Sequence, residues 1–301
     1  MDASVAGPSG LDKFDFDAAG ICAAPMPAFP IPSGATGIDV LVRDNVGSRN
    51  LEGFSLHRWR GDIPPGAVRV VAPGIHMCTP ELAFVQMAPI LGVTALVRLG
   101  LSLCAGYWLE PEHGDIVRRE ALTSVTRIRE FIARSGRRAA IERCRRAAAL
   151  LADGAVSPRE IVLYMLCCMP ARMGGYGLGG ALFNRGIKIK DEEVFLLDRP
   201  DREVVRPDIS WPGTNVRAEY LGHDHDCKIE EDRRRDNLVT ALGYRSFQVD
   251  ASQVSDPVAF DVTMRQVAWA LGRRIPERTD DWLQARGDLR QLLLGHDRVR
   301  M

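Results

Sequence analysis

Residues 206–221 read RPDISWPGTNVRAEYL, and this stretch decides the fold of the C-terminal half. Two runs that alternate apolar and polar residues flank a Pro-Gly turn signal, which predicts a β-hairpin. A turn centred on Gly213 and Thr214 places Asp208 directly opposite Glu219. The sequence therefore predicts an antiparallel strand pair that carries two facing acids.

Side chains alternate along each strand, so the hairpin has an apolar face and a polar face. The apolar face, expected to pack on the core, carries Ile209, Trp211, Val216, Ala218 and Tyr220. The polar face carries Asp208, Ser210, Arg217 and Glu219.

The facing acids have two interpretations. Directly opposite β-carbons lie about 5 Å apart, so two carboxylates there repel one another unless a cation lies between them. A divalent metal would supply that cation. The alternative is an ordinary solvated face on which Arg217 neutralises Glu219 in a surface ion pair.

Composition restricts the class of protein. The 301 residues suffice for two domains, and the hydrophobic fraction of 46% and charged fraction of 26% are typical of a soluble globular chain. Lys+Arg and Asp+Glu both number 39, so no net charge attracts nucleic acid and any such binding must be local. Arginines do cluster, at 118–119, 137–138, 143–146 and 233–235, either as a backbone-contacting stripe or as solvated helix surface.

Cysteine usage predicts a reducing cytoplasm, because the seven cysteines are scattered and show no C-x-x-C spacing. The vicinal Cys167 and Cys168 are expected to pack in the core. The most apolar stretch, 82–109, is interrupted by Arg98 and by Gly and Pro, which predicts buried helices and no membrane span.

The pattern along the chain predicts four parts: a loose arm at 1–34, an α+β domain at 35–152, an α/β domain at 153–275 and a helical tail at 276–301. In the first domain, strands are expected at 38–42, 53–57, 68–71 and 75–77, and Thr79-Pro80-Glu81 begins a helix. In the second, the order is a helix from Ser157, a strand at 181–190, the hairpin, a helix at 228–242, a strand at 244–249 and a helix from Asp256.

This order resembles the restriction-endonuclease-like PD-(D/E)xK fold, a mixed sheet flanked by helices. The residues that carry the resemblance belong to its very-short-patch-repair-like branch. They are Pro207-Asp208, Glu219-Tyr220-Leu221-Gly222 with His225, the D-x-x-R pattern of 232–235 and Gly243-Tyr244. Residues 35–110 resemble AbiEi-like antitoxin regulators through His57-Arg58, Pro64 and the 79–83 helix start.

The resemblance implies phosphodiester hydrolysis of DNA with Mg²⁺ or Mn²⁺. Asp208 and Glu219 would be the metal ligands, Glu160 the acid from the preceding helix, and His225 a group for proton transfer or phosphate contact. Nucleic-acid contacts are expected from Arg217, Arg233 and Arg235.

Leu221 departs from the pattern, because the wider fold carries Lys there and this branch carries Asp. A leucine neither binds metal nor orients water. The alternative is therefore a catalytically silent regulator of antitoxin type that binds DNA or a protein partner such as a toxin. The sequence does not determine the oligomeric state.

Three motifs have competing explanations. Ser157-x-x-Glu160 is a capping box, in which Glu160 would bond the Ser157 amide instead of a metal. His223 and His225 share a strand face and could bind zinc, although no Cys or further His stands at ligand spacing. Residues 175–180 match G-x-G-x-x-G, but a helix precedes them and a strand follows, the reverse of a dinucleotide site.

Overall fold

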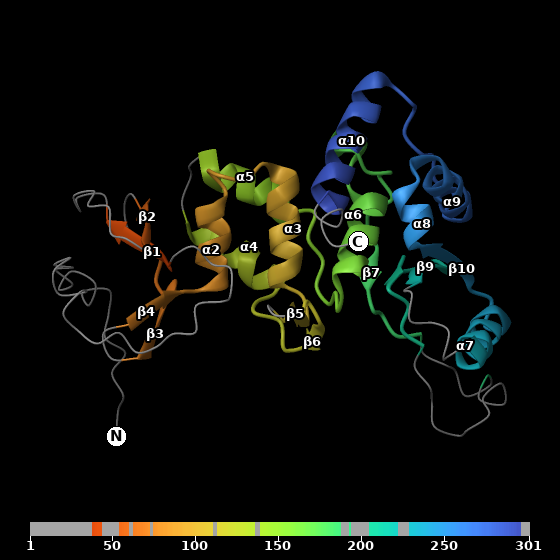
Figure 1. The fold of residues 1–301 in the computed structure, drawn as a ribbon, viewed down its shortest axis with the longest axis horizontal. Helices are drawn as coiled ribbons and strands as arrows, with labels where there is room; N and C mark the ends of the chain where they lie inside the picture. Colours follow the sequence, from red (N-terminus) through yellow and green to blue (C-terminus); the bar gives the residue numbers. More distant parts are fainter. Residues whose placement is uncertain are drawn as a thin grey trace. The chain divides into compact units, whose positions relative to one another are not determined.

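A computed structural model describes residues 38–43, 54–59, 63–72, 75–110, 113–135, 139–187, 193, 205–221 and 229–295. The chain divides into two compact units, one formed by residues 1–79 with 109–115 and the other by 80–108 with 116–301. Figure 1 labels their elements. The four-part division predicted from the sequence stays a prediction.

The first unit contains the four predicted strands. They are β1 (Ile38–Arg43), β2 (Phe54–Trp59), β3 (Val68–Ala72) and β4 (Ile75–Cys78). β1 and β2 pair in parallel, whereas β3 and β4 form an antiparallel pair with a register shift between Val70 and Ala72. The sequence expectation of strands here is confirmed.

The second unit begins with helices and one short strand pair, whose residue Leu109 belongs to the first unit. The helices are α2 (Pro80–Met87), α3 (Val93–Leu103), α4 (Val125–Arg134) and α5 (Ala139–Ala148), and the strands are β5 (Tyr107–Leu109) and β6 (Ile116–Arg118). α2 begins at Pro80, as the Thr-Pro-Glu signal predicts. The four helices contact one another through buried apolar side chains, including Phe84, Leu101, Ile128 and Phe131. In the described part of the chain no helix is long and apolar enough to cross a membrane.

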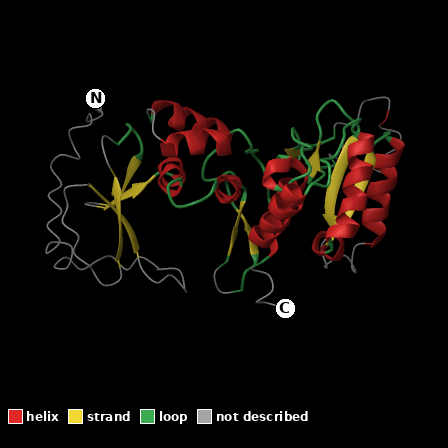
Figure 2. Ribbon diagram, turned by 90° about the horizontal axis from the view of Figure 1, so that it is seen from above, coloured by secondary structure: helices red, strands yellow, loops and turns green. Residues whose placement is uncertain are grey.

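A mixed four-stranded sheet forms the rest of this unit, in the order β10-β9-β8-β7. Its strands are β7 (Leu182–Phe183), β8 (Ile209–Ser210), β9 (Val216–Leu221) and β10 (Arg245–Asp250), with only β9 and β10 parallel. The helices beside it are α6 (Pro158–Cys168), α7 (Ile229–Ala241), α8 (Ala251–Ser255) and α9 (Pro257–Ala270). Figure 2 shows strands and helices packed together in this region. The α/β class and the mixed sheet flanked by helices are confirmed, while a restriction-endonuclease-like core stays a prediction.

The predicted strand at 181–190 is much shorter in the structure. Leu182 and Phe183 pair with β8, and then Asn184 adopts a left-handed conformation with φ of +47°. Such a residue cannot continue an extended strand. Residue Ile187 forms one further bridge, to Val205, and residues 188–190 lie outside the described part.

The C-terminal helix α10 (Asp280–Leu294) packs on α6 and on the 3₁₀ turn η2 (Ala171–Met173). Gly174 makes this approach possible, because a β-carbon there would lie 2.2 Å from the Ala285 carbonyl oxygen. Arg98 of α3 donates to the Leu292 carbonyl at 2.6 Å. The predicted helical tail is therefore part of the second unit.

Candidate functional site

The hairpin has the predicted register. Ile209 pairs with Ala218 and Ser210 with Arg217, and continuing this register sets Asp208 opposite Glu219. The turn carries Gly213 at φ of +76°, a conformation that favours glycine. The two acids are therefore neighbours for the reason that the sequence gives, namely the length and chemistry of the turn.

Both faces of the hairpin are covered. The apolar face is buried at Ile209, Trp211, Val216 and Ala218, as predicted, while Tyr220 is only half-buried. On the polar face Arg217 is 0% exposed and Glu219 is 8% exposed. The ion pair between Arg217 and Glu219 that the second interpretation predicted is present, but the face is not a solvated surface, because α7 places charged side chains against it.

Arginine side chains lie beside Glu219. Arg217 Nη1 lies 3.0 Å and Arg235 Nη2 lies 3.3 Å from Glu219 Oε1. On its other side Arg217 Nη2 donates to Asp236 Oδ1 at 3.1 Å, and Gln248 Nε2 donates to Asp236 Oδ2 at 2.6 Å. The negative charge of Glu219 is thus matched by two guanidinium groups from β9 and α7.

Glu160 caps α6. Ser157 Oγ accepts a hydrogen bond from the Glu160 amide at 3.2 Å, and the Glu160 carboxylate bonds the Ser157 hydroxyl at 3.1 Å. The carboxylate also accepts from the Val156 amide at 2.9 Å and from Asn184 Nδ2 at 2.7 Å. Ser157 therefore caps the helix as predicted, but the Glu160 carboxylate reaches back to the Val156 amide instead of the predicted Ser157 amide. Both carboxylate oxygens are engaged in this cap.

Asp208 is the acid whose charge is least well matched. Its Oδ2 accepts the Tyr220 amide at 2.7 Å. Burial, together with the negative charges of Glu160 and Glu219, raises the pKa of Asp208 to about 7, against the opposing effects of the Tyr220 amide and Arg235. Burial likewise raises the pKa of Glu160. The three predicted acids thus interact electrostatically in one region.

The high pKa of Asp208 predicts a pH-dependent stability. The folded protein holds a proton up to about pH 7 that an ordinary aspartate, with its pKa of 3.8, releases earlier. The stabilisation from this bound proton is therefore complete below a pH of 3.8 and is lost as the pH rises through about 7. We expect wild type to lose about 2–3 kcal/mol relative to Asp208→Asn between about pH 5 and about pH 8.

Urea denaturation of both proteins across this range measures the difference. Asparagine keeps an oxygen that can accept the Tyr220 amide, so the comparison isolates the ionisation. Asp288→Asn, at an exposed position of α10, is the matched control and should show a constant difference from wild type. A pH-independent difference for Asp208→Asn would mean that Asp208 ionises normally in the folded protein.

The predicted contact residues have different environments. Arg233 is exposed and stays available for a nucleic acid. The prediction that Arg217 contacts a nucleic acid is wrong, because a side chain without exposed surface cannot reach a phosphate. Arg235 is half-buried and also donates to the Arg206 carbonyl at 2.7 Å, so it ties α7 to the segment before β8. His225, and His223 with its zinc alternative, lie outside the described residues.

Sequence reasoning missed Asp236 and Gln248, which complete the charge network. Gln248 stands beside Glu219 in the parallel β9–β10 register, and Asp236 lies on α7, where it contacts Arg217 and Gln248. Alternation along β10 could have placed Gln248 on one face. The parallel pairing that brings it to Glu219 is not visible from local pattern.

The donor set fits a divalent metal poorly. Within the described residues no three His, Cys, Asp or Glu side chains are grouped so that they could hold a metal ion. Glu160 is engaged in the helix cap, Glu219 is ion-paired, and Leu221 supplies no ligand atom. Asp208 keeps a carboxylate that no cation contacts at ion-pair distance among the described side chains, and the Glu160 carboxylate has only neutral hydrogen-bond donors as partners.

Comparison with known proteins adds no assignment: no family model, no curated protein and no solved structure matches this chain.

Proposed function

We propose that this chain is a nuclease-derived protein that binds DNA without cutting it, with arginines occupying the place of a metal at its carboxylate pair. The observation that supports this proposal is the pairing of Glu219 with Arg217 and Arg235 at 3.0 and 3.3 Å. A carboxylate whose charge is already balanced by two guanidinium groups has little to gain from a divalent ion.

Hydrolysis would also need a group that positions or deprotonates the attacking water. The residue two positions after Glu219 is Leu221, which has neither a proton-accepting atom nor a charge. Glu160 uses both oxygens in the α6 cap. These features favour a regulator, such as an antitoxin-type protein with DNA or a toxin as its partner, and a cytoplasmic location belongs to the same proposal.

A second function, endonuclease activity dependent on Mg²⁺ or Mn²⁺, is favoured by one specific observation. Asp208 is half-buried near Glu160 and Glu219, and desolvation together with these two charges raises its pKa to about 7 despite Arg235; shifted carboxyl groups of this kind are frequent at functional sites. Asp208 and Glu219 would hold the ion in that case. His225 would be the candidate for proton transfer.

Incubation with supercoiled plasmid separates the two functions. We expect wild type to leave the plasmid uncut in Mg²⁺ and in Mn²⁺. We also expect it to bind the plasmid, which slows migration of the intact plasmid in a gel. Cleavage by wild type that disappears in both Asp208→Ala and Glu219→Ala would establish the endonuclease instead. Asp288→Ala, an exposed acid of α10, is the control against a contaminating nuclease.

A further inference from the structure

The α4–α5 helical hairpin has a strong local charge. Residues 125–149 contain eight arginines, two glutamates and no lysine or aspartate, a local charge of +6. The whole chain has 39 basic and 39 acidic residues, so the remainder has 31 against 37, a charge of −6. Positive charge is therefore concentrated on the segment that contains these two helices, in a molecule whose net charge is zero; the helices themselves hold six of the eight arginines and both glutamates.

Some of these arginines support the helices. Arg129 donates through Nε and Nη2 to the Ala148 carbonyl, at 3.2 and 2.9 Å, and so caps the end of α5. Arg143 bonds the Ala88 carbonyl, which joins α5 to the end of α2. Arg127 lies 3.1 Å from the buried Glu81. These contacts fix the helix pair as a rigid platform.

Other arginines project from the platform. Arg146 is exposed on α5, and Arg134 is exposed at the end of α4, where its guanidinium lies 5.9 Å from the centre of the Phe131 ring. Arg145 is half-buried and lies 2.9 Å from Glu142. Exposed guanidinium groups at the ends of helices are available to phosphate oxygens.

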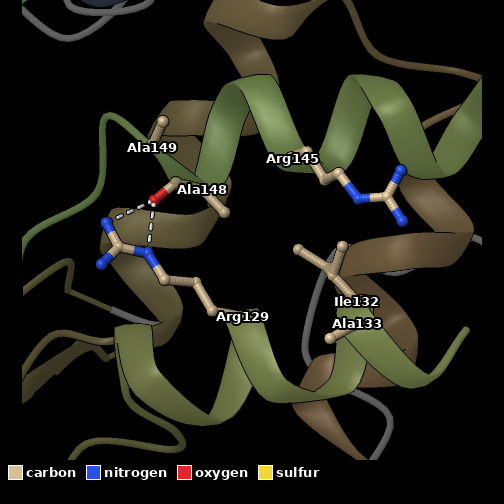
Figure 3. A pocket seen from close by; sticks show the side chains of 6 residues that line it. All are labelled: Arg129, Ile132, Ala133, Arg145, Ala148 and Ala149. Carbon is tan, nitrogen blue, oxygen red and sulfur yellow. Dashed lines mark hydrogen bonds between the residues drawn. The ribbon is translucent and has the colours of Figure 1, made fainter.

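A groove of about 330 Å³ runs between the two helices (Figure 3). Arg129 of α4 and Arg145 of α5 line it from the two sides. The remaining lining is apolar and mostly small: Ile132, Ala133, Ala148 and Ala149. Alanines at these positions let a large ligand approach the helix backbones closely, while the arginines supply charge at the rim.

We propose that the α4–α5 hairpin binds the phosphodiester backbone of a nucleic-acid duplex, with Arg134 and Arg146 as phosphate contacts. The occupant is a polyanion because the surface is basic and the rest of the chain is acidic. Backbone binding needs positive charge and no base-specific hydrogen bonds, which exposed arginines on two adjacent helices can supply. This inference rests on the proposed nucleic-acid partner and locates it away from the carboxylate pair.

Fluorescence anisotropy with labelled duplexes of DNA and of RNA tests the proposal in a series of salt concentrations. We expect Arg134→Glu/Arg146→Glu to weaken binding about 100-fold near 0.1 M salt and to lower the salt slope by about 2, since each phosphate contact contributes about tenfold there. Preference for one duplex identifies the partner, and equal binding indicates backbone recognition alone.

Arg172→Glu/Arg274→Glu is the matched control, because it makes the same charge change at exposed positions elsewhere in the second unit. Urea unfolding of both double variants checks that the fold is retained. If the two double variants weaken binding equally, or if neither weakens it, the α4–α5 hairpin is not the binding surface, although the protein still binds a duplex. If wild type binds neither duplex, the proposed nucleic-acid partner is wrong as well. This outcome differs from the previous one, in which wild type still binds a duplex.

Discussion

Replacing Asp261 by asparagine will lower the free energy of unfolding by about 3–5 kcal/mol, the usual cost of removing one partner from a buried ion-pair network. Asp261 lies in α9 and is 1% exposed. Its carboxylate contacts Arg286 at 3.1 Å, Arg265 at 3.4 Å and also Arg278. The Tyr176 hydroxyl donates to the same group. One negative charge thus holds three positive ones.

The loss is large because Arg286 cannot move into solvent. Arg286 is buried, and its guanidinium lies 5.3 Å from the Tyr176 ring centre and 5.1 Å from that of Trp282. An asparagine leaves this cation without its counter-charge inside the contact between α9 and α10.

Urea denaturation at neutral pH measures the effect, with Asp288→Asn on α10 as the control. Asp288 is exposed and contacts Gln284 at 3.0 Å, so its substitution should change stability by less than about 0.5 kcal/mol. Equal stabilities of Asp261→Asn and wild type would show that the network does not hold α10 in place.

Replacing Arg217 by methionine will also cost about 3–5 kcal/mol. Methionine fills much of the same volume but removes the charge between Glu219 and Asp236, which lie 3.0 and 3.1 Å from the guanidinium. Two acids would then share one region with Asp208, whose pKa Glu219 already raises. The repulsion among these acids should destabilise the β8–β9 hairpin before the rest of the sheet.

Arg233→Met is the matched control, because Arg233 is exposed on α7 beside the same network. We expect a change of less than about 0.5 kcal/mol in the free energy of unfolding. The Nε and Nη1 atoms of Arg217 are buried and have no hydrogen-bond partner among the described residues, so Nη1 contacts Glu219 as an ion pair without a well-aligned hydrogen bond and the wild-type network is itself imperfect. A stable Arg217→Met protein would mean that Arg235 alone compensates Glu219.

Local chemistry in the sequence was enough to predict the hairpin and the start of α6. The register follows from the Pro-Gly turn, and the cap follows from Ser157 with Glu160, because each depends on residues a few positions apart. The apolar face was also predictable from alternation. These features depend on neighbours along the chain.

The buried charge network was not predictable by the same reasoning. Arg217 looks like a surface residue in its strand, and only the packing of α7 turns it into a fully buried one. Gln248 reaches Asp236 because β10 pairs in parallel with β9, a long-range choice. Asn184 shortens the predicted strand through its own left-handed backbone, which residue type alone does not require.

The central claim is that arginines, and no divalent ion, balance Glu219, and the most direct test is the effect of Mg²⁺ on unfolding. An ion that binds only the folded state stabilises it by RT ln(1 + c/Kd), where c is the free ion concentration, so the free energy of unfolding rises with that concentration. We predict the same unfolding free energy with and without Mg²⁺ for wild type, Glu219→Gln and Asp208→Asn. Stabilisation of wild type by Mg²⁺ that vanishes in both variants would contradict the account and establish a metal site at the hairpin.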